Sequence, residues 1–186
     1  MIKELLLKTR SYRRYDENRA MTEEDIRAIA EAVRLVPSAG NLQRVRVAFV
    51  NNTLQNEEIF STLGFAAYLK DWDGPAVGER PVGYAVLMTE REPDVNLAID
   101  IGIAAEGMLL SAMERGIGGC IFRSFNKERL SEILKKDGYI PALVISFGYP
   151  AETVVIEDVK NGDVKYYRDT DGVHHVPKRS TDEILI

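Results

Sequence analysis

Apolar residues at helical spacing are the clearest pattern in this chain. Thr22 has the side chain of a helix N-cap and precedes three acidic residues, and apolar residues then recur every three or four positions until Pro37. Residues 94 to about 115 form the longest such stretch and are apolar on nearly every side, which predicts a buried central helix or one half of a subunit interface. Shorter helices are expected over residues 2–9, 54–63 and 126–134.

Short apolar runs between these helices predict strands. Residues 82–88 are apolar nearly throughout, and such a run predicts a central strand that is buried on both faces. Further strands are expected over residues 45–50, 120–122 and 142–147. A chain of 186 residues is most simply one domain, so the pattern predicts a single α+β domain over residues 1–186, with helices packed on one mixed sheet.

The last quarter of the chain has a different pattern. Residues 154–156 and 164–167 flank Asn161-Gly162, a dipeptide typical of a two-residue hairpin turn, and are therefore expected to pair with each other. Residues 176–186 are partly apolar but have no neighbouring segment of their own length to pair with. We therefore expect them to form an extended C-terminal arm.

Composition narrows the class of protein. A formal net charge of -5 provides no electrostatic footprint for nucleic acid, and anionic lipid would repel such a chain. The single cysteine, Cys120, excludes an intramolecular disulfide and lies in an apolar run, as a buried structural thiol would. With no signal peptide or membrane-length apolar run in the sequence, we expect a cytoplasmic protein with neither a nucleic acid nor a membrane as its partner.

Two basic clusters suggest a phosphate site. Arg10 and Arg13 surround the hydroxyl of Ser11, and guanidinium and hydroxyl groups are suited to hold a phosphate. Lys178-Arg179, near the other end of the chain, would complete the site if the fold brings the two clusters together. The alternative is a solvated basic loop, because arginines are usually exposed.

A turn with three amide or hydroxyl side chains follows the second predicted helix. A simple helix-terminating turn explains the proline and glycine in residues 37–43, but it gives no purpose to Ser38, Asn41 and Gln43. Amides both donate and accept hydrogen bonds, so these side chains match the edge of a flat heterocycle such as an isoalloxazine ring. The adjacent His174 and His175 point to opposite faces if they lie on a strand, so no metal site is expected there.

The order of these segments resembles the nitroreductase family of FMN-dependent oxidoreductases. The shared order is basic-Ser-x-basic, a helix, Pro-Ser-x-x-Asn-x-Gln, a segment after the central helix and a glycine-rich turn, and a late Val-Pro-Lys-Arg-Ser. The resemblance covers nearly the whole chain. It implies a nitroreductase-like fold with a mainly antiparallel central sheet, and a homodimer whose C-terminal arms are exchanged.

The same resemblance implies which residues contact FMN. The first loop and the late segment would bind the phosphate and ribityl chain, and the turn would reach the flavin of the partner subunit. The third segment would pass beside the ring and bring a backbone amide to flavin N5. The implied cofactor-binding residues are Arg10, Ser11, Tyr12, Arg13, Pro37, Ser38, Ala39, Asn41, Gln43, Ile121, Phe122, Arg123, Ser124, Lys178 and Arg179.

Three features depart from the family pattern: two substitutions, and a region between the second and third flavin segments that is reduced to residues 64–81. Arg44-Val45 stands where the family usually has proline and then an aromatic residue, and Arg123 stands where glycine or an acid is frequent. Arg123 would either stabilise reduced, anionic flavin or face solvent. Residues 64–81 are either a surface loop with buried aromatics or a lid that places Tyr68 or Trp72 on the substrate.

The function implied is hydride transfer from NAD(P)H through flavin N5 to a small oxidised acceptor, such as a nitroaromatic or a quinone. Because the cofactor performs this chemistry, no catalytic acid–base pair is expected in the sequence. One alternative is a flavin-binding sensor or storage protein without nicotinamide turnover. Another is a helical interaction module that has an anion site and no flavin.

Overall fold

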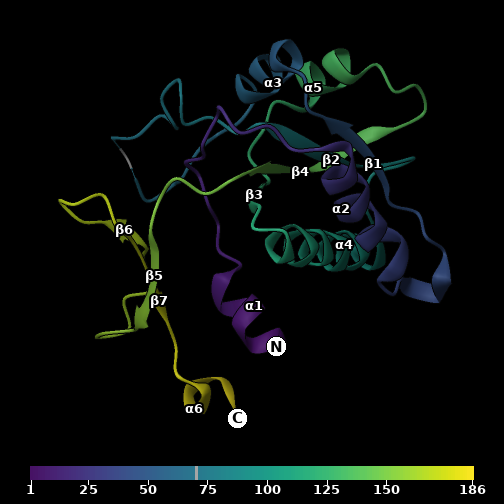
Figure 1. Ribbon diagram of the computed structural model, residues 1–186. Helices are drawn as coiled ribbons and strands as arrows, with labels where there is room; N and C mark the ends of the chain where they lie inside the picture. Colours follow the sequence, from purple (N-terminus) through teal and green to yellow (C-terminus); the bar gives the residue numbers. More distant parts are fainter. Residues whose placement is uncertain (70) are drawn as a thin grey trace.

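A four-stranded antiparallel sheet forms the centre of the protein (Figure 1). The computed structural model describes residues 1–69 and 71–186. The strand order is β1-β2-β4-β3, and each neighbouring pair is antiparallel. The strands are β1 (Arg46–Val50), β2 (Gly83–Thr89), β3 (Gly118–Phe122) and β4 (Ile140–Gly148). All residues of β2 are buried between two neighbours, which confirms the prediction of a central strand.

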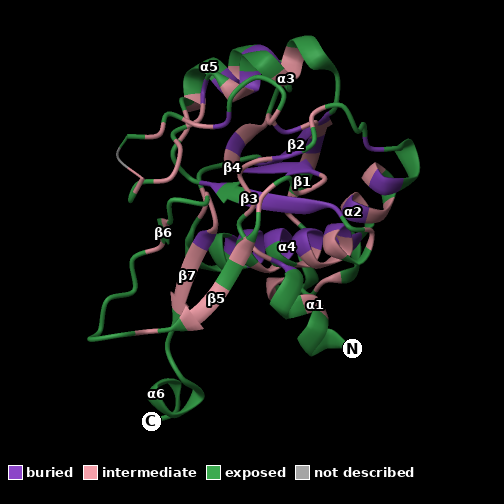
Figure 2. Ribbon diagram, turned by 60° about the vertical axis from the view of Figure 1, so that its left-hand side comes forward, coloured by how far each residue is buried: buried purple, intermediate pink, exposed green. Residues whose placement is uncertain are grey.

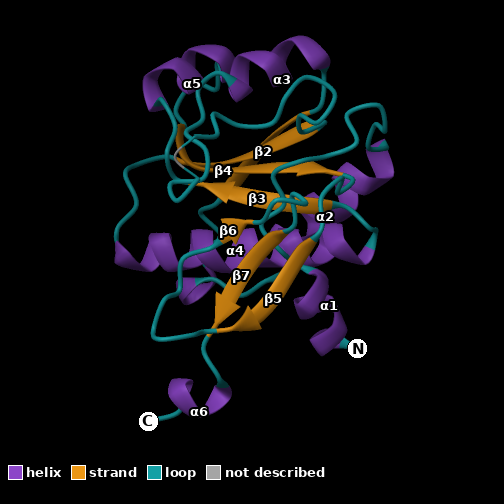
Figure 3. Cartoon of the chain, turned by 90° about the vertical axis from the view of Figure 1, so that its left-hand side faces the viewer, coloured by secondary structure: helices purple, strands orange, loops and turns teal. Residues whose placement is uncertain are grey.

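Helices cover both faces of this sheet and confirm the predicted α+β class (Figure 3). The helices are α1 (Ile2–Lys8), α2 (Glu23–Leu35), α3 (Thr53–Phe60), α4 (Val95–Glu114), α5 (Lys127–Leu134) and α6 (Thr181–Ile184). The side chains of Thr22, Asp94 and Asn126 accept hydrogen bonds from backbone N–H groups in the first turns of α2, α4 and α5. These caps satisfy N–H groups that a helix leaves free, so the helices begin where the sequence predicts.

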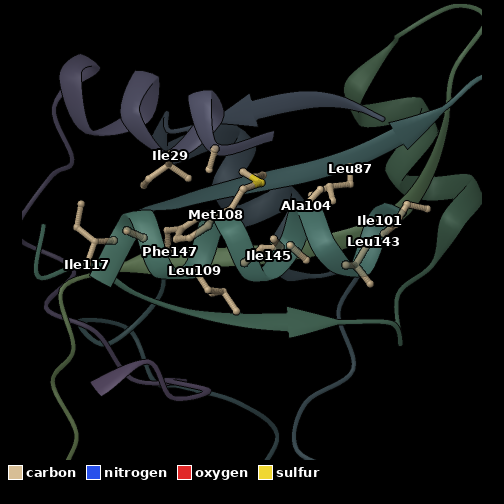
Figure 4. Packing of buried hydrophobic residues seen from close by; sticks show 14 of the residues in the cluster. Ile29, Leu87, Ile101, Ala104, Met108, Leu109, Ile117, Leu143, Ile145 and Phe147 are labelled. Carbon is tan, nitrogen blue, oxygen red and sulfur yellow. The ribbon is translucent and has the colours of Figure 1, made fainter. Parts of the chain in front are cut away.

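The alternation of side chains along the central strands produces two apolar cores. On one face, Leu87 and Phe147 pack with Ile29 of α2 and with Met108 of α4 (Figure 4). On the other face, β2 residues of the opposite parity pack with α3 and α5, together with Phe122 of β3. A strand between two cores must be apolar at every position, which is the pattern seen at residues 82–88.

The central helix α4 is buried on one side only. Leu97, Ala104 and Met108 face the sheet, whereas Val95 is 77% exposed and Ile99 is 56% exposed. Figure 2 shows the two sides of α4 in contrasting colours. The prediction that α4 is buried on every side is therefore wrong for a single chain. The alternative, that its exposed side forms half of a subunit interface, stays a prediction. By length and composition alone α4 could cross a membrane, but its contacts within the described residues make it a core helix.

A small second sheet lies to one side of the main one (Figures 1 and 3). Its strands are β5 (Val154–Asp158), β6 (Tyr167–Arg168) and β7 (His174–Lys178), in the order β5-β7-β6. The predicted pairing across Asn161-Gly162 is wrong. A turn exists there, with the Asp163 N–H donating to the Lys160 carbonyl over 3.0 Å, but β5 pairs with β7 in parallel.

The exposed C-terminal arm in the structure is shorter than the arm predicted from the sequence. Residues 176–178 belong to β7 and pair with β5 of the same chain, so they are not free. Residues 179–186, which include α6, are exposed and extend away from the sheets (Figure 1). Arm exchange between two subunits stays a prediction that concerns this last segment.

Candidate functional site

Buried anchors fix the loop that carries Arg10, Ser11 and Arg13. The Tyr12 N–H donates to the Gly119 carbonyl over 3.0 Å, and the buried Tyr15 hydroxyl lies 2.8 Å from Ser146 Oγ. The loop sits flush on β3 because position 118 is glycine: a Cβ there would lie 2.5 Å from the Tyr12 ring.

A buried carboxylate, Glu152, ties the same loop to the second sheet. One of its oxygens accepts from the backbone N–H groups of Arg13 and Arg14, and the other accepts from Arg168 Nη2 over 2.9 Å. Its side chain is almost completely buried, so all three bonds form away from solvent. Glu152 is not among the residues that the sequence predicts for the site, because nothing local to residue 152 signals that it is buried.

The structure brings the first basic cluster and Lys178 of the second to one cavity of about 320 Å³. Arg10, Ser11 and Arg13 line it from the loop, and Lys178 lines it from β7. His174 and Val176 also line it, because alternate residues of a strand share a face. The remaining lining residues are Thr9, Glu106, Leu109, Ile121 and Tyr166.

Two buried nitrogen atoms indicate which kind of ligand this cavity would bind. Arg10 Nε and His174 Nδ1 are buried and have no hydrogen-bond partner among the described residues. Leaving a buried polar group unpaired costs about 1–3 kcal/mol, so a partner for both atoms would stabilise the site. Cations, a hydroxyl and unpaired nitrogens around one small cavity match the acceptor oxygens of a phosphate monoester.

Arg179 does not share the cavity with Lys178. Its Nη1 atom lies 3.2 Å from Glu183 Oε1 in α6, and it is absent from the cavity lining. Neighbouring residues in an extended segment point in opposite directions, so only one member of a Lys-Arg pair can face the site. Of the two, Lys178 is the one that the structure places with the loop.

The turn that carries Ser38, Asn41 and Gln43 lies elsewhere in the chain. Pro37, Ser38 and Gln43 line a different cavity, of about 310 Å³, between α2, α4 and β1. The described lining of this cavity has no residue in common with the lining of the basic cavity. One chain therefore does not bring the turn to the basic cavity, and the expectation that a partner subunit supplies it stays a prediction.

Asp100 of α4 holds this turn in place. It is 3% exposed, and its Oδ1 atom accepts from the Ala39 N–H over 2.8 Å. Arg44, the residue that departs from the family pattern, lies with Nη2 3.9 Å from Asp100 Oδ2. The turn needs such support because Gly40, Asn41 and Gln43 all have positive φ angles, which are unfavourable for the two non-glycine residues.

Replacing Asp100 with asparagine should therefore destabilise the protein. The variant keeps the shape of the side chain but loses the charge that strengthens the bond to Ala39 and attracts Arg44. We expect urea denaturation to show a loss of about 1–2 kcal/mol in the free energy of unfolding. Glu114→Gln, at an exposed position of the same helix, is the matched control. Equal stability of the two variants would contradict this role for Asp100.

The third predicted segment lies along β3, the outer strand of the main sheet, and just after it. Ile121 of β3 is partly exposed and lines both the basic cavity and an adjoining cavity of about 670 Å³. Arg123 and Phe125 also line the larger cavity. The Phe122 ring is buried against Phe65, with ring centroids 5.0 Å apart, so at this position only the backbone can face a ligand.

Backbone contact also fixes Ser124. Its carbonyl accepts from the Gly64 N–H over 2.8 Å, and a Cβ at residue 64 would lie 2.5 Å from Ser124 Oγ. The start of the segment over residues 64–81 is therefore packed closely against the end of the third predicted segment.

If residues 64–81 form a lid rather than a surface loop, Tyr68 or Trp72 would stack on the substrate. The Tyr68 ring lies 5.0 Å from the ring of Tyr166, which lines the basic cavity. Trp72 packs against Phe65 with ring centroids 5.9 Å apart, and the Arg168 guanidinium lies 4.3 Å from its ring centroid. Neither Tyr68 nor Trp72 is among the described residues that line the basic cavity. Lys70, within the same segment, lies outside the described residues.

The two histidines have opposite surroundings. His174 is 1% exposed, whereas His175 lies 3.2 Å from Glu157 and 3.0 Å from Asp169. Burial, and then the nearby Arg13, lower the pKa of His174 to about 4, whereas the hydrogen bond to Asp169 raises the pKa of His175. Strand alternation predicted the opposite faces, but not that His174 faces the basic cavity. No described cluster of histidine, cysteine and carboxylate side chains is arranged to hold a metal ion.

Burial also raises the pKa of the Cys120 thiol and keeps it protonated. A protonated thiol is a poor nucleophile, so a structural role suits this residue better than a catalytic one.

Comparison with known proteins agrees with the fold and with the family that the sequence resembles. The model of the nitroreductase family matches residues 6–149. NfrA1 of B. megaterium is 18% identical with a TM-score of 0.69, and the match covers 98% of this chain and 77% of that one. A nitroreductase family protein from Streptococcus pneumoniae is 18% identical with a TM-score of 0.68, covering 100% of this chain and 99% of that one.

A third solved structure, NfnB from Mycobacterium smegmatis, is described as an FMN-dependent nitroreductase in complex with NADPH. It is 20% identical with a TM-score of 0.65, and the match covers 81% of this chain and 87% of that one. No curated protein gives a significant match to this sequence. At these identities the solved structures establish the fold.

Proposed function

Because the chain belongs to the nitroreductase family of oxidoreductases, we propose that it binds FMN and uses it to reduce a small oxidised acceptor with NAD(P)H. The observation that carries this proposal is the basic cavity. Residues from both ends of the chain converge there, and two buried nitrogen atoms have no hydrogen-bond partner in the described part of the chain. A single phosphate monoester needs such a cavity, whereas a dinucleotide is usually bound at a glycine-rich turn between a strand and a helix.

The chain's own residues would bind and orient the cofactor. Arg10, Arg13 and Lys178 would neutralise the phosphate, and Ser11 would donate its hydroxyl to it. Ile121 lies between the basic cavity and the larger cavity, so the ribityl chain would pass this residue and leave the ring near Arg123. The backbone of residues 122–124 would then face the reactive edge of the ring.

When bound, FMN supplies the hydride chemistry at N5, which explains why the protein needs no acid–base pair of its own. The nicotinamide and the acceptor would use the same face in turn. The NADPH complex of the related NfnB supports a nicotinamide as the reductant. We place the protein in the cytoplasm, where reduced nicotinamides are available and a free thiol such as Cys120 persists.

The active form would be a homodimer. The exposed stripe of α4 that includes Val95 and Ile99 would be covered by the same stripe of a second copy. The turn with Ser38, Asn41 and Gln43, which does not meet the basic cavity of its own chain, would reach the flavin of the partner. The exposed residues 179–186 would pack on that partner.

The visible spectrum tests this function. We expect the purified protein to be yellow and to release FMN, rather than FAD, on heating, as mass spectrometry would identify. Anaerobic NADH or NADPH should bleach the flavin absorbance, and a quinone or nitroaromatic should restore it. A bound flavin that neither nicotinamide bleaches would support a sensor or storage protein. A protein that binds no flavin, even after reconstitution, would contradict the proposal.

A further inference from the structure

Among the described residues that line the basic cavity, His174 is the one buried, ionisable side chain that the proposed function leaves without a role. It lies on β7, four residues before Lys178 and on the same side of the strand. Its Nε2 atom is 3.5 Å from Arg13 Nη1, and its ring centroid is 5.2 Å from that of Tyr166. Its Nδ1 atom is buried and has no partner among the described residues.

The charges around this imidazole come from several elements. Arg13 approaches from the loop, and its guanidinium also lies 5.0 Å from the Tyr166 ring centroid. The charges of Glu152, which is bonded to the loop backbone, and of Arg168 on β6 also influence the pKa of His174. His175 does so from the same strand. The cavity adds Arg10, Glu106 and Lys178. Glu152 is already bonded to Arg168 and to the loop backbone, so its charge is largely matched.

These surroundings leave the imidazole neutral at pH 7 in the protein without a ligand. Burial and Arg13 both disfavour a second proton, and they lower the pKa of His174 to about 4. A phosphate in the cavity would reverse this balance, because it would bring an opposite charge and an acceptor oxygen to a nitrogen that lacks a partner.

We propose that His174 is a ligand of the FMN phosphate that donates an imidazole N–H to a phosphate oxygen and takes up a proton as FMN binds. This inference rests on the proposed function, because it needs FMN in the basic cavity. It adds a residue outside the segments on which the family resemblance rests, and it links FMN binding to pH. Relative to a variant that lacks this imidazole, the unmodified protein should therefore gain affinity for FMN as the pH falls from 7.5 to 6, because the protonation of the FMN phosphate itself affects both proteins alike.

Nuclear magnetic resonance can test this directly, since the chain has only two histidines. The imidazole Cε1–H signals would be titrated in the protein stripped of flavin, and then with FMN, with riboflavin and with inorganic phosphate. We expect FMN to raise the pKa of His174 by about 2–3 units, which is within the range for an opposite charge within hydrogen-bonding distance and is enough for proton uptake near pH 6 to 7. The signal of His175, on the outer face of the same strand, should keep its pKa and serves as the internal control. A His175→Gln variant assigns the two signals.

Riboflavin, which lacks the phosphate, should leave the pKa of His174 unchanged, whereas inorganic phosphate should raise it at high concentration. Equal shifts with FMN and riboflavin would contradict a phosphate contact. FMN that binds, as shown by quenching of its fluorescence, while the His174 titration does not move would overturn this inference alone. FMN that does not bind would overturn the proposed function together with it.

A His174→Asn variant provides a second readout. Asparagine retains a donor but cannot gain a charge, so the extra gain in affinity between pH 7.5 and 6 should disappear, whereas His175→Asn should retain it. An unchanged pH dependence in His174→Asn would contradict the proton uptake. Because the titration of the unmodified protein is independent of this variant, the inference stays testable even if His174→Asn folds poorly.

Discussion

Replacing Arg13 or Lys178 with alanine is expected to weaken FMN binding by about 1.5–3 kcal/mol each, or roughly 10- to 150-fold. Both residues line the basic cavity, and each would lose a charge-assisted bond to a phosphate that is partly shielded from water. Titration of FMN into the flavin-free variants, followed by the quenching of flavin fluorescence, measures the change. Riboflavin should bind the variants and the unmodified protein almost equally, because it lacks the phosphate.

Two other arginines serve as controls for this result. Arg27→Ala removes an exposed charge on α2 and should not change FMN affinity. Arg179→Ala tests which member of the Lys-Arg pair binds the phosphate, because in the structure Arg179 contacts Glu183 instead. A loss in Arg179→Ala as large as in Lys178→Ala would show that the C-terminal segment rearranges when FMN binds. Equal affinity in all four variants would mean that the basic residues are merely solvated.

The main sheet could be predicted from sequence because its signals are local. Residues 82–88 are apolar throughout, and the cap residues Thr22, Asp94 and Asn126 stand directly before their helices. The second sheet could not be predicted in the same way. Its parallel pairing of β5 with β7 joins segments about 20 residues apart, and no local motif competes with the turn signal of Asn161-Gly162.

The candidate site was also only partly visible in the sequence. The order of the motifs identified the basic loop and the Lys178-Arg179 pair. Only the alternation of side chains along the extended segment shows that Lys178 faces the cavity and Arg179 does not. Glu152 and Asp100 support the two predicted segments through buried carboxylates. Acidic residues are seldom fully buried, so no pattern around either one distinguishes it from an exposed acid. Their roles depend on burial, which the fold as a whole determines.

Introducing a charge at Ile99 should separate the proposed dimer and release FMN together. Ile99→Asp places a carboxylate on the exposed apolar stripe of α4 without touching the core of its own chain. In a two-fold dimer the change occurs twice at one interface, and each unpaired charge taken out of water costs several kcal/mol. We expect the dimer dissociation constant to rise by about a thousandfold or more, as measured by sedimentation at micromolar concentration.

Loss of flavin should accompany dissociation, because a ligand held by two chains stabilises their association and is in turn stabilised by it. Deleting residues 180–186 should have a smaller effect in the same direction, since those residues are exposed in one chain and would pack on the other. Leu54→Asp is the matched control: Leu54 is 82% exposed on α3, on the opposite face of the sheet, and should change neither assembly nor flavin content. A monomeric Ile99→Asp protein that retains FMN at micromolar concentration would contradict the shared site, because all residues needed for binding would then lie within one chain.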